Sequence, residues 1–302
     1  MSTLALPAEL IDSASLPPRL WDLRDLRGQL GLDVAVQDSR SYVRRQSHSG
    51  FLRVIRPHYL DGSGQAFLTM INPGGGYFGG DDYRIDVHLD EDASLLLTDQ
   101  SATTVYKTPG DYCLQEVNVS LGAGAVLEYL PSQVIPFRDA TYHQHLRVSM
   151  DPTATFLSTE IITPGWSPDR GLFEYDEVRL RSAISVGGRP VLLDNLLVRP
   201  GSHSHEADSL LFLEDMTHLG TLTAIDARID DEVLALVRQV LAERAAAASQ
   251  PLRFAATCTG GPGLSVRVIG THTDDITACL HGVADALRAR WRGQGPLQLR
   301  KQ

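Results

Sequence analysis

Hydrophobic and polar residues alternate along most of the chain from Leu32 onward. Between residues 83 and 89, apolar or aromatic residues occupy the odd positions, while arginine, aspartate and histidine occupy the even ones. Because side chains two residues apart lie on the same face of a β-strand, this pattern predicts a strand with one buried face. Residues 117–121 and 142–148 follow the same rule. The alternation therefore predicts a mainly β protein.

Two short strands joined by a polar bend form a unit that recurs along the chain. An apolar-polar-apolar triplet is followed, three residues later, by a second triplet that begins with a small residue. The unit begins at Val87, Val119, Val148 and, in a looser fourth copy, Ile184, so successive copies start 32, 29 and 36 residues apart. A single unit cannot bury its apolar face alone, whereas stacked units bury it against each other. We therefore predict a β-helix or solenoid-like stack of strands, with a sandwich of similar hairpins as the alternative.

The last quarter of the chain changes to a helical period. Val233, Val237 and Leu241 recur on one helix face, and the acidic residues just before them suit the positive end of the helix dipole. A second helix is predicted from about Thr273, and strands over 252–258 and 264–269 separate the two helices. The predicted fold class is mainly β with two helices in the C-terminal region.

Composition along the chain suggests three parts. Residues 1–27, which include Pro17-Pro18, form an N-terminal extension, and residues 293–302 form a tail. Residues 28–292 form a single domain, because no linker-like stretch interrupts them. Within it, the β body runs to about residue 228 and an α/β end covers 229–292.

Charge and cysteine content narrow the classes of function for these 302 residues. A net charge of −10 and a pI near 5.4 exclude the basic surface that nucleic-acid binding requires. The first twenty residues carry Glu9 and Asp12 and do not form a signal peptide, and no uncharged apolar run reaches the ~18 residues of a membrane span. The three cysteines are far apart, which is typical of a reducing compartment. We therefore expect a cytoplasmic protein without nucleic-acid or membrane partners.

A glycine-rich stretch over 73–82 contains a formal G-x-G-x-x-G pattern. That pattern binds a dinucleotide when a helix follows it, but here a strand follows, and the chain has no Gly-Lys-Ser/Thr phosphate-binding sequence. We interpret the stretch as a bend in which backbone passes close to backbone. Its glycines are predicted to be structural: Gly74, Gly75, Gly79 and Gly80.

Two His-x-His pairs are candidate metal ligands, because alternate residues of a strand share a face. His143 and His145 are followed by Arg147 and by no carboxylate, so we expect solvated histidines there. A cupin-like metal enzyme using this pair stays open as an alternative. His203 and His205 lie in a loop-like sequence and are a weak candidate for metal contact.

Three isolated carboxylates lie in apolar or glycine-rich surroundings: Asp81, Glu160 and Asp194. A buried charge is costly unless it is paired, so each residue is either a hydrogen-bonded turn or edge residue or has a function. The sequence contains no recognisable arrangement of nucleophile, base and orienting group. We therefore expect a protein that is not an enzyme.

Several segments, in order and at similar spacing, resemble the urease accessory protein D family (UreD/UreH). The likeness extends from about Arg27 to Arg292. The segments that carry it are Arg56-Pro-His-Tyr59, Pro73-Gly74 through Gly79-Gly80-Asp81, Leu96-Leu-Thr-Asp-Gln-Ser-Ala-Thr-Thr-Val-Tyr106, Leu127-Glu-Tyr-Leu-Pro131 and Ile135-Pro-Phe-Arg-Asp-Ala140. The chain departs from the family pattern in three places. Thr104 stands where many members have lysine, and residues 165–171 differ from the usual Gly-Arg-Pro followed by Gly-Glu. A family acid just before the Phe67 strand has no counterpart at Ser63-Gly64.

The resemblance implies a mostly β scaffold without enzymatic activity and without a cofactor of its own. It implies direct binding of the helical urease accessory protein F and, through it, of the GTPase accessory protein G. Together they would act on apo-urease so that nickel(II) enters its active site. The family's proposed nickel passage falls, by alignment, on Asp81, Glu160 and Asp194. A carbohydrate-binding β-solenoid module remains a further alternative, although it would use exposed aromatic residues and the chain has only three tryptophans.

Overall fold

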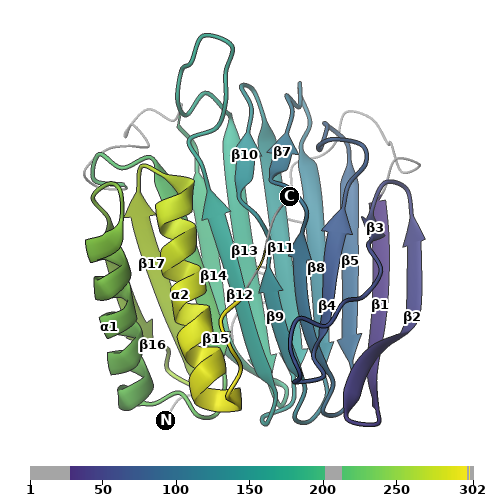
Figure 1. Cartoon of the computed structure of the whole chain (residues 1–302). Coiled ribbons are helices and arrows are strands. Elements are labelled where there is room, and N and C mark those ends of the chain that lie inside the picture. The colour runs from purple at the N-terminus through teal and green to yellow at the C-terminus, as the bar shows by residue number, and fades with distance from the viewer. Residues whose placement is uncertain (1–27, 201–212, 298, 300–302) are drawn as a thin grey trace.

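The computed structural model describes residues 28–200, 213–297 and 299. The predicted extension over 1–27, residues 298 and 300–302 of the predicted tail, and His203 and His205 therefore lie outside the described residues. The described chain is mainly β-sheet with two helices, arranged as a solenoid-like stack of two facing sheets (Figure 1). This confirms the predicted fold class.

Sheet A has the strand order β14-β13-β11-β8-β5-β1-β2 among the described residues. Its five central strands run parallel, and β2 and β14 flank them in the antiparallel direction. The strands of sheet A are β1 (Gly28–Gln37), β2 (Arg40–Ser49), β5 (Asp82–Leu89), β8 (Cys113–Leu121), β11 (Thr141–Met150), β13 (Glu177–Val186) and β14 (Arg189–Val198).

Sheet B faces it with the order β16-β17-β15-β12-β9-β6-β4-β3, and the short β7 and β10 pair beside this path. Strands β4, β6, β9 and β12 run parallel, while β15, β17, β16 and β3 each pair antiparallel with their neighbours. The strands of sheet B are β3 (Arg53–Val54), β4 (Ala66–Ile71), β6 (Ser94–Asp99), β7 (Thr103–Val105), β9 (Val126–Leu130), β10 (Val134–Pro136), β12 (Thr155–Ile162), β15 (His218–Ile225), β16 (Arg253–Cys258) and β17 (Gly263–Gly270).

The recurring unit read from the sequence is the turn that carries the chain from sheet A to sheet B. Three copies do this, at β5–β6, β8–β9 and β11–β12. The looser fourth copy is different, because β13 and β14 pair with each other as an antiparallel hairpin within sheet A. Gly187 and Gly188 make this tight turn with φ of 54° and 75°, a left-handed conformation that glycine adopts at little cost. The prediction of a fourth solenoid turn was therefore wrong.

Helices α1 (Asp231–Ala247) and α2 (Thr273–Arg292) pack on each other and cover part of the outer face of sheet B (Figure 1). Helix α1 begins where the side chain of Asp230 accepts a hydrogen bond from the Val233 N–H at 2.8 Å, which satisfies a backbone donor that the helix leaves unpaired. Helix α2 ends at Gly293, with φ of 64°. Neither described helix is both long enough and apolar enough to span a membrane.

Two apolar cores result from this layering. The larger core fills the space between the two sheets, and the second fills the space between sheet B and the helices. Alternate residues of a sheet B strand therefore enter different cores: in β12, Phe156 and Ile162 face sheet A, while Leu157 and Ile161 face the helices. A polar residue on such a strand is enclosed whichever way it faces.

Candidate internal cavity

A cavity of about 70 Å³ lies between the two sheets, large enough for several water molecules. Its lining includes the exposed residues Gly75, Gln100 and Ser101, so the cavity reaches the surface beside the glycine-rich loop. The polar side chains that line its buried part include Tyr77, Asp99, Gln115, Tyr129, Gln144 and Glu160. An enclosed polar space of this kind interrupts an otherwise apolar core.

Glu160 places its carboxylate in this cavity from strand β12. Burial away from bulk water, together with the negative charge of Asp194, raises the pKa of Glu160 to about 7. The Gln144 side chain opposes this, because its Nε2 donates to Oε1 of Glu160 at 2.5 Å and favours the ionised form. Glu160 is half-buried because it borders the cavity. Its charge therefore changes near neutral pH.

A chain of buried polar side chains leads from the core to Glu160. The Tyr77 hydroxyl donates to Oε1 of Gln115 at 2.6 Å, and Nε2 of Gln115 donates to Oε1 of Gln144 at 3.4 Å. The Tyr142 hydroxyl also donates to Oε1 of Gln144, at 3.0 Å. Burial raises the pKa of both tyrosines, so they remain donors across the physiological range.

Asp99 is a second carboxylate that lines the cavity, and the sequence analysis did not select it. It ends strand β6, and its Oδ1 accepts a hydrogen bond from the Ser132 N–H at 2.7 Å. Burial, together with the negative charges of Asp99 and Glu160, raises the pKa of Tyr129. The available signal was that Asp99 follows an apolar run within the segment that resembles the UreD family.

Asp81 closes the glycine-rich loop and does not line the cavity. Its Oδ2 accepts hydrogen bonds from the Phe78 N–H at 2.9 Å and from the Tyr83 hydroxyl at 3.1 Å. The Tyr83 ring stacks on Tyr77, with the ring centroids 3.8 Å apart, and Tyr77 borders the cavity. Asp81 is thus separated from the cavity by this pair of rings.

The glycines of this loop lie where a side chain would meet strain or a close neighbour. Gly75 and Gly80 have φ of 78° and 82°, and a Cβ on Gly79 would lie 3.1 Å from Cα of Thr108. Gly74 is exposed. Gly76, which the sequence analysis did not single out, is the most crowded, because a Cβ there would lie 2.9 Å from the Thr104 carbonyl oxygen. The loop therefore keeps its close approach to the neighbouring turn through glycine.

Asp194 pairs with a cation at the edge strand of sheet A. From β14 in sheet A its carboxylate reaches Arg267 on β17 in sheet B, whose Nη2 donates to Oδ1 at 2.9 Å and to Oδ2 at 3.0 Å. The site is half-exposed, so desolvation is partial. Asp194 acts on Glu160 through its charge but does not line the cavity.

His143 and His145 are buried, so the expectation of solvated histidines was wrong. They lie on the outer face of sheet A, where Nε2 of His143 contacts Oε1 of Glu177 at 2.8 Å and its ring stacks on Tyr112. Nδ1 of His145 accepts from Arg147 at 3.3 Å. Burial and the charge of Arg147 lower the pKa of His145 to about 4. This cation disfavours metal binding beside His145.

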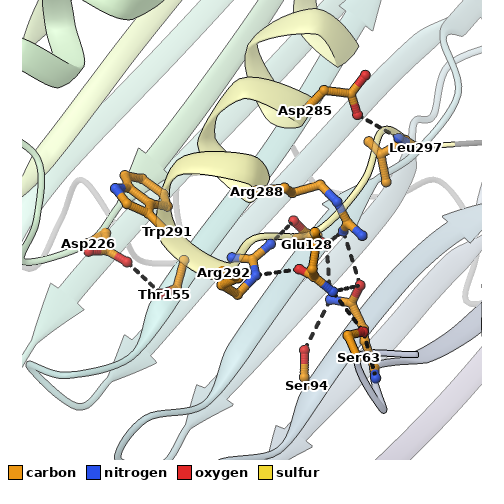
Figure 2. A network of polar contacts seen from close by, with 12 residues as sticks. Ser63, Ser94, Glu128, Thr155, Asp226, Asp285, Arg288, Trp291, Arg292 and Leu297 are labelled. Carbon is orange, nitrogen blue, oxygen red and sulfur yellow. Dashed lines mark hydrogen bonds and ion pairs between the residues drawn. The ribbon is translucent and has the colours of Figure 1, made fainter. Parts of the chain in front are cut away.

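A second buried carboxylate, Glu128 on β9, faces the helices instead of the cavity. Figure 2 shows Arg288 and Arg292 of α2 converging on it, and both guanidinium groups form ion pairs with Glu128. Nε2 of Gln65 adds a hydrogen bond to Oε2 of Glu128 at 3.0 Å. Neither Glu128 nor these arginines stood out in the sequence as site residues. They fasten α2 to sheet B.

Four aromatic rings form a row beside the glycine-rich loop, and one of them, Tyr106, lies close to Gly76, which lines the cavity. Phe78 stacks on Tyr106 at 4.7 Å between centroids, Tyr106 meets Phe137 edge-on at 5.1 Å, and Phe137 meets Trp166 at 4.7 Å. Phe78 and Trp166 are 50% and 52% exposed. We call these four residues the aromatic row. Exposed aromatic clusters of this type are common where proteins bind one another.

The donor set of the cavity suits a weakly held, hydrated cation. Within residues 28–200, 213–297 and 299, no group of three or more His, Cys, Asp or Glu side chains is placed to hold a metal ion. The cavity instead offers two carboxylates with neutral amide and hydroxyl groups. Oxygen donors such as these attract divalent ions but bind nickel less tightly than histidine or thiolate ligands do.

Comparison with known proteins agrees with the resemblance read from the sequence. The family model described as UreD urease accessory protein matches residues 26–302. A protein named urease accessory protein UreD from Paenarthrobacter aurescens is 44% identical over 284 residues, covering 91% of this chain and 95% of its own length. Proteins of the same name from Actinomyces naeslundii and Corynebacterium glutamicum are 44% and 42% identical and cover 91% and 90% of this chain, and 98% and 96% of their own lengths. The chain belongs to the family of UreD urease accessory proteins.

Proposed function

We propose that this protein is a non-catalytic scaffold for urease maturation, and that nickel(II) passes through its internal cavity on the way to apo-urease. The observation that carries the proposal is the cavity between the sheets, which reaches the surface and contains the carboxylates of Asp99 and Glu160. Nickel is the cargo in this scheme and not a resident cofactor. The setting is the cytoplasm, which the three free thiols fit.

The cavity chemistry supports passage in preference to storage. A route must attract an ion and also release it, as conducting pores do. Glu160 accepts a proton near neutral pH, so an arriving cation displaces a proton and a returning proton helps to release the cation. The charge of Asp194, which pairs with Arg267, acts on Glu160. Asp81 accepts a hydrogen bond from Tyr83, whose ring stacks on the cavity-lining Tyr77. We keep Asp81 and Asp194 in the proposed passage as flanking residues.

The aromatic row is the surface that we propose for the partner, urease accessory protein F, with the GTPase accessory protein G bound through it. Phe78 and Tyr106 are close in sequence to Gly76 and Thr104, which line the cavity. A partner that covers the aromatic row would therefore also cover the cavity opening. The nickel ion could then pass between the proteins without entering bulk water.

One co-expression experiment tests both parts of this proposal. Urease is produced with accessory proteins F and G and with variants of this chain, and nickel per urease active site is measured beside a pull-down of the complex. Asp81→Asn, Glu160→Gln and Asp194→Asn, alone and together, should keep the complex and lower the nickel content. Trp166→Ser should lose the complex. Full nickel loading by the triple variant would refute the passage, and an intact complex with Trp166→Ser would refute the docking surface.

The alternative functions have weaker support. A cupin-like enzyme would need His143 and His145 open to a metal, and both are buried, with Arg147 against His145. A carbohydrate-binding module would present open ring faces, whereas Phe78 and Tyr106 cover each other by stacking. Nickel bound tightly and stoichiometrically at His143 and His145 would revive the first alternative.

A further inference from the structure

Glu160 stands at the end of a directed series of hydrogen bonds. Each amide in the series accepts through its oxygen and donates through its nitrogen, from Tyr77 to Gln115, to Gln144 and finally to Glu160. The direction is fixed at the Glu160 end while Glu160 is ionised, because an ionised carboxylate only accepts, and the buried Tyr77 keeps its hydroxyl proton to donate. In that state the Gln144 amide cannot reverse without losing its bond to Glu160.

The series holds one oxygen of Glu160 and leaves the other to the cavity. Oε1 accepts from Nε2 of Gln144 at 2.5 Å, and no hydrogen bond to Oε2 is made by any residue that the structure describes. Gln144 is itself only 5% exposed, so its position is set by packing. Glu160 comes from sheet B and Gln144 from sheet A, which makes this contact a bridge across the cavity.

We propose that Gln144 is a positioning residue: it holds Oε1 of Glu160 and turns Oε2 into the cavity as the oxygen that meets an arriving divalent cation. Gln115, Tyr77 and Tyr142 support it by fixing the orientation of its amide. The inference rests on the proposed function for its biological meaning. The contact and its effect on the titration of Glu160 do not depend on that function.

The test removes the amide but keeps the shape of the side chain. Gln144→Met deletes the donor to Oε1, so the ionised form of Glu160 loses a hydrogen bond and its titration midpoint should rise. Because a hydrogen bond to the charged form is lost, the midpoint should move upward by roughly one pH unit or more. The midpoint is followed by NMR of protein labelled with ¹³C at the glutamate carboxyl carbon, with Glu160→Gln identifying the resonance.

A matched control exists on the surface. Gln239 of α1 donates to Oε1 of Glu243 at 2.9 Å, the same type of contact in an exposed setting. Gln239→Met should leave the Glu160 midpoint unchanged. Tyr142→Phe serves as a second variant should Gln144→Met fail to fold, because it removes the hydroxyl that orients the Gln144 amide. It should raise the midpoint in the same direction by a smaller amount.

The functional readout is the pH profile of apo-urease activation by the purified accessory complex with nickel chloride. Gln144→Met should move the rising limb of the profile to higher pH, whereas Glu160→Gln should lower activation at every pH. An unshifted Glu160 resonance in both Gln144→Met and Tyr142→Phe would overturn the positioning role. Normal activation by Glu160→Gln with a shifted resonance in Gln144→Met would leave the positioning role standing and refute the passage through Glu160.

Discussion

Glu128 and Glu160 lie on the neighbouring parallel strands β9 and β12 of sheet B and face opposite sides of it. Glu128 faces α2, where Arg288 and Arg292 both pair with it. Glu160 faces sheet A, where it meets a neutral amide and the negative charge of Asp194. Both residues are carboxylates on adjacent strands and both lie between layers of the fold, but they differ in the groups opposite them.

The difference separates a buried acid that stabilises the fold, Glu128, from one whose ionisation destabilises it, Glu160. Removing two opposite charges from water is costly, and close ion pairs with additional hydrogen bonds offset that cost. Glu128 has this compensation from two cations and Gln65. Glu160 lacks a cation among its described contacts, so burial and the charge of Asp194 raise its pKa to about 7. An acid kept in that condition points to a task other than folding.

Replacing Glu128, the acid paired with two arginines, should have the largest effect on stability. Glu128→Gln keeps the shape but removes the shared counter-charge of Arg288 and Arg292 and leaves only Asp61, 3.7 Å from Arg288, to compensate, so it should cost about 3–5 kcal/mol of unfolding free energy. Urea unfolding followed by circular dichroism measures the loss. Glu232→Gln is the matched control, because Glu232 pairs with Arg290 of the same helix and is 79% exposed, so it should change stability by less than about 1 kcal/mol. Equal stability of both variants would remove Glu128 from its structural role.

Neutralising Glu160, which has no cation beside it among the described residues, should instead stabilise the protein. The pKa of Glu160 rises from an ordinary value of 4.5 to about 7 on folding, so the folded state holds the proton more tightly. As pH rises from 4.5 to 7, the unfolded state ionises first and the folded protein loses up to about 3 kcal/mol. Glu160→Gln never ionises and should therefore be more stable than the wild type above pH 7, by at most that amount.

The pH dependence is what identifies the cause. The advantage of Glu160→Gln should shrink as pH falls toward 4.5, whereas Glu128→Gln should be less stable than the wild type at neutral and alkaline pH alike. Unfolding free energies at pH 5, 6, 7 and 8 test this. A constant advantage across that range would mean that the amide side chain of the Glu160→Gln variant packs better and that the charge of Glu160 is not responsible.

The sequence alone predicted the stack of strands but not which side chains contact each other between its layers. Alternation and the recurring unit are local signals, and they located the turns at β5–β6, β8–β9 and β11–β12. The fourth turn was misassigned although Gly187-Gly188 is itself a hairpin signal. The partners of the acids are distant in sequence: Arg288 lies 160 residues from Glu128 and Arg267 lies 73 residues from Asp194. Such pairings are set by the stacking of sheets and helices, which local periodicity does not encode.

His143 and His145 illustrate the same limit. Alternation correctly separates them from the core residues Tyr142 and Leu146, and an outward face suggested solvent. Both are nevertheless buried, because the outer face of sheet A carries its own contacts from Tyr112, Glu177 and Arg147. Facing away from a core is therefore weak evidence for exposure in a protein with more than one buried layer.

The smallest expected effect tests whether Asp194 is part of what distinguishes Glu160 from Glu128. Asp194→Asn removes a negative charge near Glu160 and frees the positive charge of Arg267, and both changes favour the ionised form of Glu160. The Glu160 titration midpoint should therefore fall. The lost pair with Arg267 is half-exposed and should itself cost less than about 1 kcal/mol.

A double-mutant cycle separates these two contributions. At pH 8, Asp194→Asn and Glu160→Gln should be non-additive by on the order of 0.5–1 kcal/mol, because removing either carboxylate relieves the same repulsion. At pH 5 the coupling should vanish, since Glu160 is then protonated. The cycle of Asp194→Asn with Glu128→Gln is the control and should be additive at both pH values, because these two acids share no described partner. Additivity of Asp194→Asn with Glu160→Gln at pH 8 would show that Asp194 does not act on Glu160, and burial alone would then have to account for its raised pKa.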